Sequence, residues 1–227
     1  MLLCIPAFCF RSGIKCCIMI TESHNFRTLR QILTQHCTPS EECIRDFENA
    51  AVLCSVAKGE AVVRQGEVCD YFVFNRVGLL RVCNVTDGVE DTLLFGTSGD
   101  VFTSLHSYYN GEPSIFSLIA VVDSEVWTVS YYRMKMLSDK YPELVVWMRN
   151  LLIEQLYGFE KRYVFFNNKT AEDRFLNFLR INYGSLRRAP IKYISRIVPL
   201  KYIAQYLKIT PSTLSRLRKK LVSGGDE

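Results

Sequence analysis

The chain has 227 residues, of which 48% are hydrophobic and 22% are charged. This composition provides enough apolar side chains for folded cores and excludes a mainly disordered chain, and the length allows two domains. The net charge of +5 is unevenly distributed, because residues 167–227 hold 13 Lys and Arg against 4 Asp and Glu, whereas residues 1–166 hold 15 against 19. The basic C-terminal part is suited to a polyanion, whose counterions are released on binding.

Residues 1–21 are apolar and form a doubtful N-terminal extension. No basic region precedes the apolar part and no clean small-residue cleavage pattern follows it, so a secretory signal is not expected. Pro6, Arg11 and Lys15 interrupt the run well before the roughly 20 apolar residues that a spanning helix needs. We expect the natural chain to begin near Met19, and we expect no association with a membrane.

The cysteines all lie within the first 83 residues. Their number is odd and their spacing is irregular, which argues against the disulfide framework of a secreted protein. A reducing, cytoplasmic location is therefore expected. The nine are Cys4, Cys9, Cys16, Cys17, Cys37, Cys43, Cys54, Cys69 and Cys83.

Residues 22–137 are expected to form one domain, made mainly of strands. Ser40 or Thr38, followed by acidic residues, predicts a capped helix start. From about Val52 to Val129, short apolar runs alternate with glycine-containing turns, which indicates an antiparallel barrel or sandwich. Asp87-Gly88 between two apolar runs is the strongest hairpin signal in this region.

Residues 138–166 change to a helical period, with an apolar stripe at steps of three and four that is close to a heptad seam. One interpretation is a helix packed on the barrel. The favoured interpretation is a seam between two copies of the chain, since the stripe is long. Its members are Val145, Met148, Leu152, Leu156, Phe159, Tyr163 and Phe166.

Residues 167–227 end in the pattern of a helix-turn-helix, over Val198–Leu221. Apolar residues at steps of three and four leave one face of each helix for solvent or a ligand. Thr210 before Pro211 predicts an N-cap and the first residue of the second helix. Lys208 stands at the turn position that is often glycine, where a left-handed conformation costs roughly 1 kcal/mol.

The second helix is expected to read DNA. Its first turns expose groups that can reach base edges, and its last turn exposes cations that suit phosphates. An ordinary amphipathic helix pair with a basic, solvated end gives the same spacing, and this alternative stays open here. The expected DNA-binding residues are Thr210, Pro211, Ser212, Thr213, Ser215, Arg216, Arg218, Lys219, Lys220 and, on the first helix, Lys201.

Several strings resemble the Crp-Fnr superfamily of bacterial transcription regulators over residues 22–221. They are Lys58-Gly-Glu, Gln65-Gly-Glu, Tyr71-Phe-Val-Phe, Gly78-Leu-Leu-Arg-Val, Gly99-Asp-Val-Phe, Arg174-Phe-Leu-x-Phe-Leu and the segment Pro199–Arg218. The resemblance implies an α+β fold with an antiparallel, cyclic-nucleotide-binding-like β-roll, a long dimerisation helix and a winged-helix-like helix-turn-helix domain. It also implies a homodimer that binds double-stranded DNA, works with RNA polymerase and relays a signal from the roll to the recognition helices.

The resemblance indicates which residues of this chain would contact a DNA base and which would stand at the cyclic AMP site. Arg216 is the best candidate for a guanine contact, with Ser212 beside it, whereas Pro211 replaces a base-reading arginine found in many members. In members that bind cyclic AMP, a Gly-Glu pair holds the ribose and an Arg-Ser pair holds the phosphate. Here the matching residues are Gly99-Asp100 and Pro113-Ser114, so the bidentate phosphate partner is missing.

Cyclic AMP binding is therefore not expected, and the effector is left unidentified. Gly99, Asp100 and Ser114 are candidates for an effector pocket, with chain turning as the alternative, and a cyclic-nucleotide response through an atypical pocket remains a second reading. Any strands of a wing would come mainly from residues 191–198.

Other chemistries find little support in the sequence. An iron–sulfur cluster needs four close thiolates, but Cys37, Cys43 and Cys54 are scattered. Haem would need a ligand such as His106. A cupin-like metalloenzyme, the low-ranked alternative, needs two or three converging histidines, whereas only His24, His36 and His106 are present. We predict no enzyme activity, no metal site and no identified cofactor.

Overall fold

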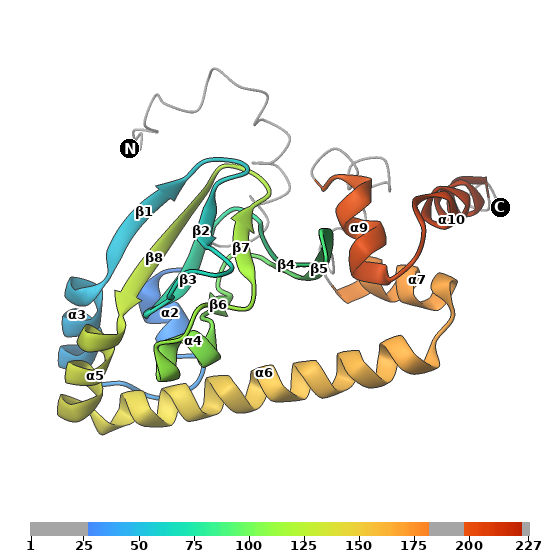
Figure 1. The fold of residues 1–227 in the computed structure, drawn as a ribbon. Coiled ribbons are helices and arrows are strands. Elements are labelled where there is room, and N and C mark those ends of the chain that lie inside the picture. The colour runs from blue at the N-terminus through green and yellow to red at the C-terminus, as the bar shows by residue number, and fades with distance from the viewer. Residues whose placement is uncertain (1–26, 182–197, 224–227) are drawn as a thin grey trace, which may run out of the picture.

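The computed structural model describes residues 27–181 and 198–223. A β-roll lies at one end, a long helix runs beneath it, and a small helical domain lies at the other end of that helix (Figure 1). This arrangement gives the predicted α+β fold.

Two short helices precede the roll. Helix α2 (Leu29–Leu33) begins with a capping box, in which Thr28 accepts from the backbone N–H of Gln31 and the side chain of Gln31 accepts from the N–H of Thr28. Helix α3 (Glu41–Ala50) is capped by Ser40, which accepts from the N–H of Cys43. Of the two predicted caps, Ser40 is therefore the one used.

The roll consists of two four-stranded antiparallel sheets with strand orders β1-β8-β3-β6 and β2-β7-β4-β5. A short helix, α4 (Leu105–Asn110), lies between β6 and β7. The strands are β1 (Val52–Val56), β2 (Ala61–Val63), β3 (Tyr71–Val77), β4 (Leu80–Thr86), β5 (Val89–Gly96), β6 (Val101–Phe102), β7 (Ser117–Ala120) and β8 (Ser124–Ser130).

The β4–β5 hairpin turns at the predicted position. Asp87 and Gly88 both have positive φ, 51° and 75°, as a two-residue turn between twisted antiparallel strands requires. Thr86 pairs with Val89 across this turn. The hairpin points from the roll toward the helical domain (Figure 1), and it thereby brings β5 into contact with that domain.

The long helical region is interrupted once. Helix α5 (Tyr131–Lys140) is followed by Tyr141, a non-helical residue, and α6 (Pro142–Asn168) begins directly after it. A residue before proline is disfavoured in the helical region, and Tyr141 accordingly has φ −124° and ψ 93°. The long helix thus starts at Pro142, four residues later than the sequence pattern indicated.

One face of α6 covers the roll. Leu144, Trp147 and Leu151 are buried in a core shared with α2, α3 and β3. Trp147 stacks on Phe74 with ring centroids 5.8 Å apart and donates its indole N–H to the carbonyl of Ile32. The N-terminal half of α6 is therefore fixed to the roll, while its C-terminal half extends to the helical domain.

The helical domain contains α7 (Ala171–Ile181), α9 (Leu200–Leu207) and α10 (Pro211–Ser223). Its core joins the apolar faces of the three helices to two residues of the roll, Leu79 and Val121. The other buried members of the core are Val198, which precedes α9, and the helical residues Phe175, Phe178, Ile203, Ala204, Leu207, Leu214 and Leu217.

Two sequence predictions lie outside the described residues. They are the doubtful extension at residues 1–21 and the wing strands, apart from Val198, whose side chain is buried in the helical core.

Candidate nucleic-acid interface and neighbouring sites

The turn between α9 and α10 has the geometry of a compact helix-turn-helix. Lys208 adopts the left-handed conformation, with φ 54° and ψ 46°, and its N–H donates to the carbonyl of Gln205. The N–H of Ile209 donates to the carbonyl of Ala204 at 3.1 Å, so the end of α9 is closed as a C-cap requires. Lysine in this conformation is strained, and its neighbours in the fold must compensate.

The start of α10 is as predicted. The Thr210 hydroxyl accepts from the N–H of Thr213 at 3.2 Å and also contacts the hydroxyls of Ser212 and Thr213 at 2.9 Å. Pro211 occupies the first position of the helix, where no backbone donor is needed. Leu214 is fully buried, which orients the opposite face of α10 outward.

The structure places most of the predicted DNA-binding side chains on the outer face of α10. Arg216 has no hydrogen bond or ion pair to the described residues. Thr213 and Arg218 are half-buried. Exposed residues are Thr210, Pro211, Ser212, Ser215, Arg216, Lys219 and Lys220.

Two of the predicted phosphate contacts are paired within the protein. Lys220 binds both carboxylate oxygens of Glu172 on α7, at 2.8 and 2.9 Å. Lys201 on α9 lies 3.8 Å from Glu90 on β5. Both lysines remain more than half exposed, so these pairs are weak and a phosphate can compete for either cation.

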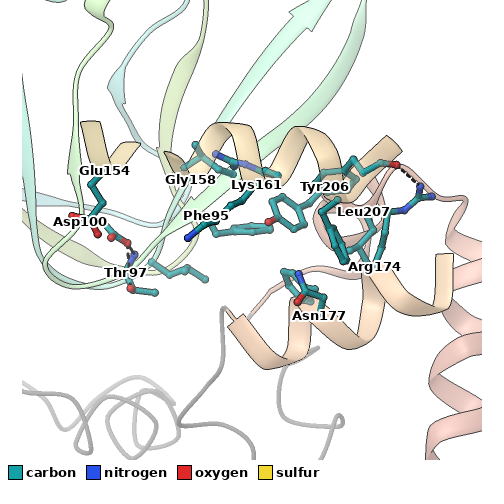
Figure 2. Close-up of a pocket in the computed structure, with 16 residues that line it drawn as sticks. Phe95, Thr97, Asp100, Glu154, Gly158, Lys161, Arg174, Asn177, Tyr206 and Leu207 are labelled. Atoms are coloured by element: carbon teal, nitrogen blue, oxygen red, sulfur yellow. Dashed lines mark hydrogen bonds between the residues drawn. The ribbon is translucent and has the colours of Figure 1, made fainter. Parts of the chain in front are cut away.

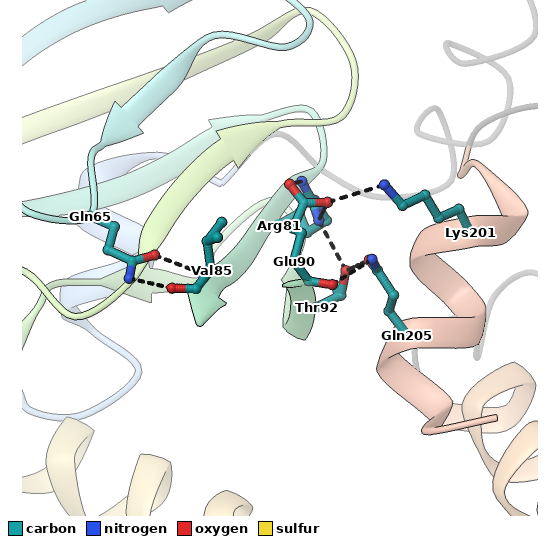
Figure 3. Close-up of polar contacts among 7 residues, drawn as sticks. All are labelled: Gln65, Arg81, Val85, Glu90, Thr92, Lys201 and Gln205. Carbon is teal, nitrogen blue, oxygen red and sulfur yellow. Dashed lines mark hydrogen bonds and ion pairs between the residues drawn. The ribbon is translucent and has the colours of Figure 1, made fainter. Parts of the chain in front are cut away.

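The first helix of the pair is attached to the roll by polar contacts that the sequence pattern did not reveal (Figure 3). Gln205 donates to the carbonyl of Glu90 at 2.7 Å and accepts from the hydroxyl of Thr92 at 2.8 Å. Lys208 pairs with Asp91. Together with the Lys201–Glu90 pair, these contacts join three consecutive residues of β5 to one face of α9.

Arg81 organises the roll side of this contact. Its side chain is 2% exposed and binds both carboxylate oxygens of Glu90, at 3.1 and 3.2 Å, as well as the hydroxyl of Thr92 at 3.0 Å. The guanidinium also lies 3.7 Å from the ring centroid of Tyr202 on α9. The hydrogen bond from Arg81 lowers the pKa of Glu90, which keeps this carboxylate charged beside Lys201.

A second contact fixes the hairpin near its turn. The amide of Gln65 donates to the carbonyl of Val85 at 3.0 Å and accepts from the N–H of the same residue at 2.7 Å (Figure 3). Near its turn, the β4–β5 hairpin is thus held to the β2–β3 loop through β4 and to α9 through β5, since Val85 and Glu90 are paired across the two strands.

The candidate effector residues of the roll are occupied by local bonds. Asp100 accepts from the N–H and the hydroxyl of Thr97, closing the Thr97–Asp100 turn. Its side chain keeps access to solvent, yet crowding by protein raises the pKa of Asp100, against the opposing effect of the Thr97 bonds. Ser114 is buried, and its hydroxyl is shared with the backbone of Phe116. Gly99 has φ +94°, so the turn favours glycine there.

These observations favour chain turning for Asp100 and Ser114. Pro113 forms an isolated bridge with Val68 instead of a phosphate contact. Beside it, the ring of Tyr108 fills space against Phe72, with centroids 4.7 Å apart. A buried hydroxyl that sequence analysis missed is Ser104, which has no hydrogen-bond partner in the described structure. No periodic signal distinguishes it in the sequence.

The described residues offer little for metal or haem chemistry. The side chain of His106 pairs with Glu112 at 2.6 Å. Within residues 27–181 and 198–223, no three His, Cys, Asp or Glu side chains converge as a metal site requires. Cys37, Cys43, Cys54, Cys69 and Cys83 are free thiols, and burial raises the pKa of Cys43 to about 12. Across the described helices, no segment is long and apolar enough to cross a membrane.

The outer face of α6 carries the apolar stripe predicted for a dimer seam. Val145, Leu156, Phe159 and Tyr163 are more than half exposed, and Leu152 is half-buried. Met148 packs partly against the roll core, and Phe166 turns toward Tyr206 in the helical domain. The stripe is wider than the sequence pattern indicated, because four further apolar side chains are exposed beside it: Val146, Ile153, Tyr157 and Val164.

A cavity of about 760 Å³ lies between the roll, the C-terminal half of α6 and the helical domain (Figure 2). Asp100, Thr97 and Glu154 lie at one end, and Arg174, Tyr206 and Leu207 lie at the other. Of the three predicted effector residues, Asp100 lines this cavity, whereas Gly99 and Ser114 do not.

Residues 53–141 match the family model of the cyclic nucleotide-binding domain. No curated protein sequence matches the chain. Among solved structures, it is similar to FixK2 from Bradyrhizobium japonicum, with 22% identity, a TM-score of 0.64, and 77% of this chain and 86% of that chain covered.

Two further structures have the same architecture. The c-di-GMP responsive global regulator CLP from Xanthomonas campestris has 16% identity and a TM-score of 0.64, with 82% of this chain and 93% of that chain covered. A CooA mutant from Carboxydothermus hydrogenoformans has 17% identity and a TM-score of 0.58, with 78% of each chain covered. Residues 53–141 are therefore similar to the cyclic nucleotide-binding domain, and the chain has the fold of these solved structures, which confirms the predicted Crp-Fnr resemblance at the level of the fold.

Proposed function

We propose that the protein is a homodimeric, sequence-specific DNA-binding transcription regulator that senses an effector other than cyclic AMP and works with RNA polymerase. The observation that carries this proposal is α10, whose first turns present hydroxyls and Arg216 to solvent and whose last turn is basic. Hydroxyls and arginine pair with base edges in the major groove, and a cationic helix end pairs with phosphates. No enzyme activity is proposed.

Support for a dimer comes from the outer face of α6. A monomer that left this long apolar stripe in water would lose the free energy that burial provides, about 25 cal/mol for each Å² removed from water. A second copy of the same helix is complementary to it by two-fold symmetry. Two helix-turn-helix units would then contact half-sites one helical turn of DNA apart.

Support for an effector other than cyclic AMP comes from the roll. Ser114 is buried with its hydroxyl engaged locally, and Pro113 supplies neither a cation nor a backbone donor. A cyclic phosphate buried there would lack a charged partner, which is costly in a protein interior.

Selection of bound sites from random duplexes tests DNA reading. We expect enrichment of a two-fold symmetric site, because a symmetric dimer presents two identical recognition helices. Selection that enriches no sequence would contradict the proposal. Enrichment of a single half-site without symmetry would retain DNA reading and remove the dimer.

The dimer has its own test. Leu156→Glu places a charge in the seam and should shift the mass measured by sedimentation equilibrium from dimer to monomer. Met136→Glu is the matched control, since Met136 is an exposed apolar residue on the neighbouring helix α5. Equal masses for wild type, L156E and M136E would show that the α6 stripe is not the interface.

A further inference from the structure

The cavity beneath the helix-turn-helix has the size of a small-molecule site. Its volume of about 760 Å³ is contributed by the roll, α6, α7 and α9, and ligand sites commonly occur at such domain boundaries, with volumes of roughly 300–1,000 Å³. A molecule bound there would contact the roll and the helical domain at once.

Gly158 creates part of this space. It lies in the interior of α6, where glycine destabilises a helix relative to alanine. Packing does not require the glycine, because a Cβ built at this position meets no atom within 4 Å. Gly158 lines the cavity, so a larger side chain at this position would extend into space that is now open.

The walls near the helical domain are aromatic. Phe95 of the roll lies 5.6 Å from Tyr206 and 6.2 Å from Phe178, and Phe166 of α6 lies 5.7 Å from Tyr206, measured between ring centroids. Rings from four separate elements, β5, α6, α7 and α9, thus line one space. Such walls favour a planar aromatic molecule, which can stack or pack edge-to-face against them.

Three cations line the cavity. They are Lys161, Arg162 and Arg174, and none of the three forms an ion pair with a described carboxylate. Arg162 donates to the carbonyl of Leu93, and Arg174 donates to the carbonyls of Phe166 and Lys208. Bonds to neutral carbonyls leave the cationic charge uncompensated, so an anionic group is attracted to these side chains.

The acidic groups lie at the opposite end. Asp100 is bonded to Thr97, and Glu154 lies 3.5 Å from His36. Figure 2 shows Asp100 and Glu154 separated from Arg174 by the length of the cavity. Asp100 and Glu154 therefore repel an anion from their end of the cavity, and Lys161 in the middle and Arg174 at the far end attract it.

We propose that this cavity binds one planar aromatic molecule with a single anionic group per chain. Its role as the effector site rests on the proposed function, whereas the binding itself does not. The site is separate from Ser114 in the roll, which does not line the cavity. A ligand there would contact both Phe95 on β5 of the roll and Tyr206 on α9. Its binding would therefore change the packing of β5 against α9.

Titration of the full-length protein with 1-anilinonaphthalene-8-sulfonate, an aromatic sulfonate whose fluorescence rises in apolar surroundings, tests the site. We expect saturation at one molecule per chain. Gly158→Trp should abolish this saturable signal by filling the cavity, whereas Gly158→Ala, the matched control, should retain it while raising the melting temperature, since alanine favours the helix.

Charge provides a second variant in case Gly158→Trp does not fold. Lys161→Glu should weaken binding about tenfold or more, because an attractive contact becomes a repulsive one. Lys58→Glu changes the net charge equally on the roll, outside the cavity, and should leave the affinity unchanged.

Absence of saturable binding to the wild type, or equal affinities for the wild type, G158W and K161E, would overturn the proposal. DNA binding is measured separately, on the selected duplex without the probe. If the wild type binds the selected duplex but shows no saturable probe binding, this inference alone is overturned. If the wild type binds the probe saturably but binds no DNA sequence selectively, the proposed function is overturned and the ligand site stands.

Discussion

The two helices of the helix-turn-helix differ in what their polar residues contact. On α9, Lys201, Gln205 and Lys208 all contact β5 of the roll. On α10, Ser215 and Arg216 point to solvent. One helix is therefore joined to the roll, and the other exposes polar residues for the DNA contact proposed above. Both helices contribute to one core through Leu207 and Leu214 and are linked by the tight turn at Lys208, so the proposed relay from the hairpin to α10 would pass through α9.

The largest expected effect comes from breaking the roll side of this contact. Arg81→Ala removes one partner of a buried ion pair and leaves Glu90 without its bidentate donor, which should cost about 3 kcal/mol in the free energy of unfolding measured in urea. Arg76→Ala is the control, since its pair with Glu125 is half exposed and should cost less than about 1 kcal/mol. Equal losses in the two variants would mean that the Arg81 contact is no stronger than a surface pair.

The next effect concerns α10. Arg216→Ala should weaken binding to the selected duplex by about 1–3 kcal/mol and relax the preference at one base pair. Fluorescence anisotropy on the selected site and on single-base variants measures both quantities. Arg45→Ala, an exposed arginine on α3, should leave binding unchanged. A uniform loss on every duplex would assign Arg216 to phosphate.

A smaller effect compares a lysine on each helix. Lys219→Ala should weaken binding on every sequence and reduce the slope of log affinity against log salt concentration by about 1. Lys201→Ala should reduce the slope less, because Glu90 already lies 3.8 Å from this lysine. The comparison fails if Lys201 changes the slope as much as Lys219 does.

The smallest expected effect tests the ion pair between β5 and the turn. Asp91→Lys and Lys208→Asp should each cost up to about 1 kcal/mol in the free energy of unfolding, because the pair is partly exposed. The double reversal should recover most of the loss, and aspartate tolerates the left-handed conformation at position 208. Strictly additive losses in this double-mutant cycle would mean that the two residues do not interact.

Much of the fold could be predicted because local signals specify it. The Asp87-Gly88 turn, the Ser40 and Thr210 caps and the start of α10 at Pro211 each depend on residues a few positions apart. The start of α6 was predicted too early, since the apolar period continues through residues 138–141 while Pro142 changes the backbone. The apolar face of α6 was predicted too narrow, because Tyr157 and Val164 lie outside a strict heptad.

The candidate sites also combine features that follow from local sequence with features that depend on distant contacts. The outward face of α10 follows from its own period, so the exposure of Ser212, Ser215 and Arg216 could be predicted. The pairing of Lys201 with Glu90 and of Lys220 with Glu172 could not, because side chains distant in sequence leave no spacing signal. In the sequence, Arg81 is one polar residue in an apolar strand. Its burial is explained only by its contacts with Glu90, Thr92 and Tyr202 in the folded chain.

The sequence by itself determined the hairpin, the helix starts and the helix-turn-helix, because caps, turns and hydrophobic period act over one or two turns of the chain. Only the tertiary structure decided which helix of the helix-turn-helix contacts the roll and where the neighbouring cavity lies. Those features depend on contacts such as Gln205 with Glu90 and Thr92, between residues more than one hundred positions apart. Such contacts form only when the packed cores bring the two domains together.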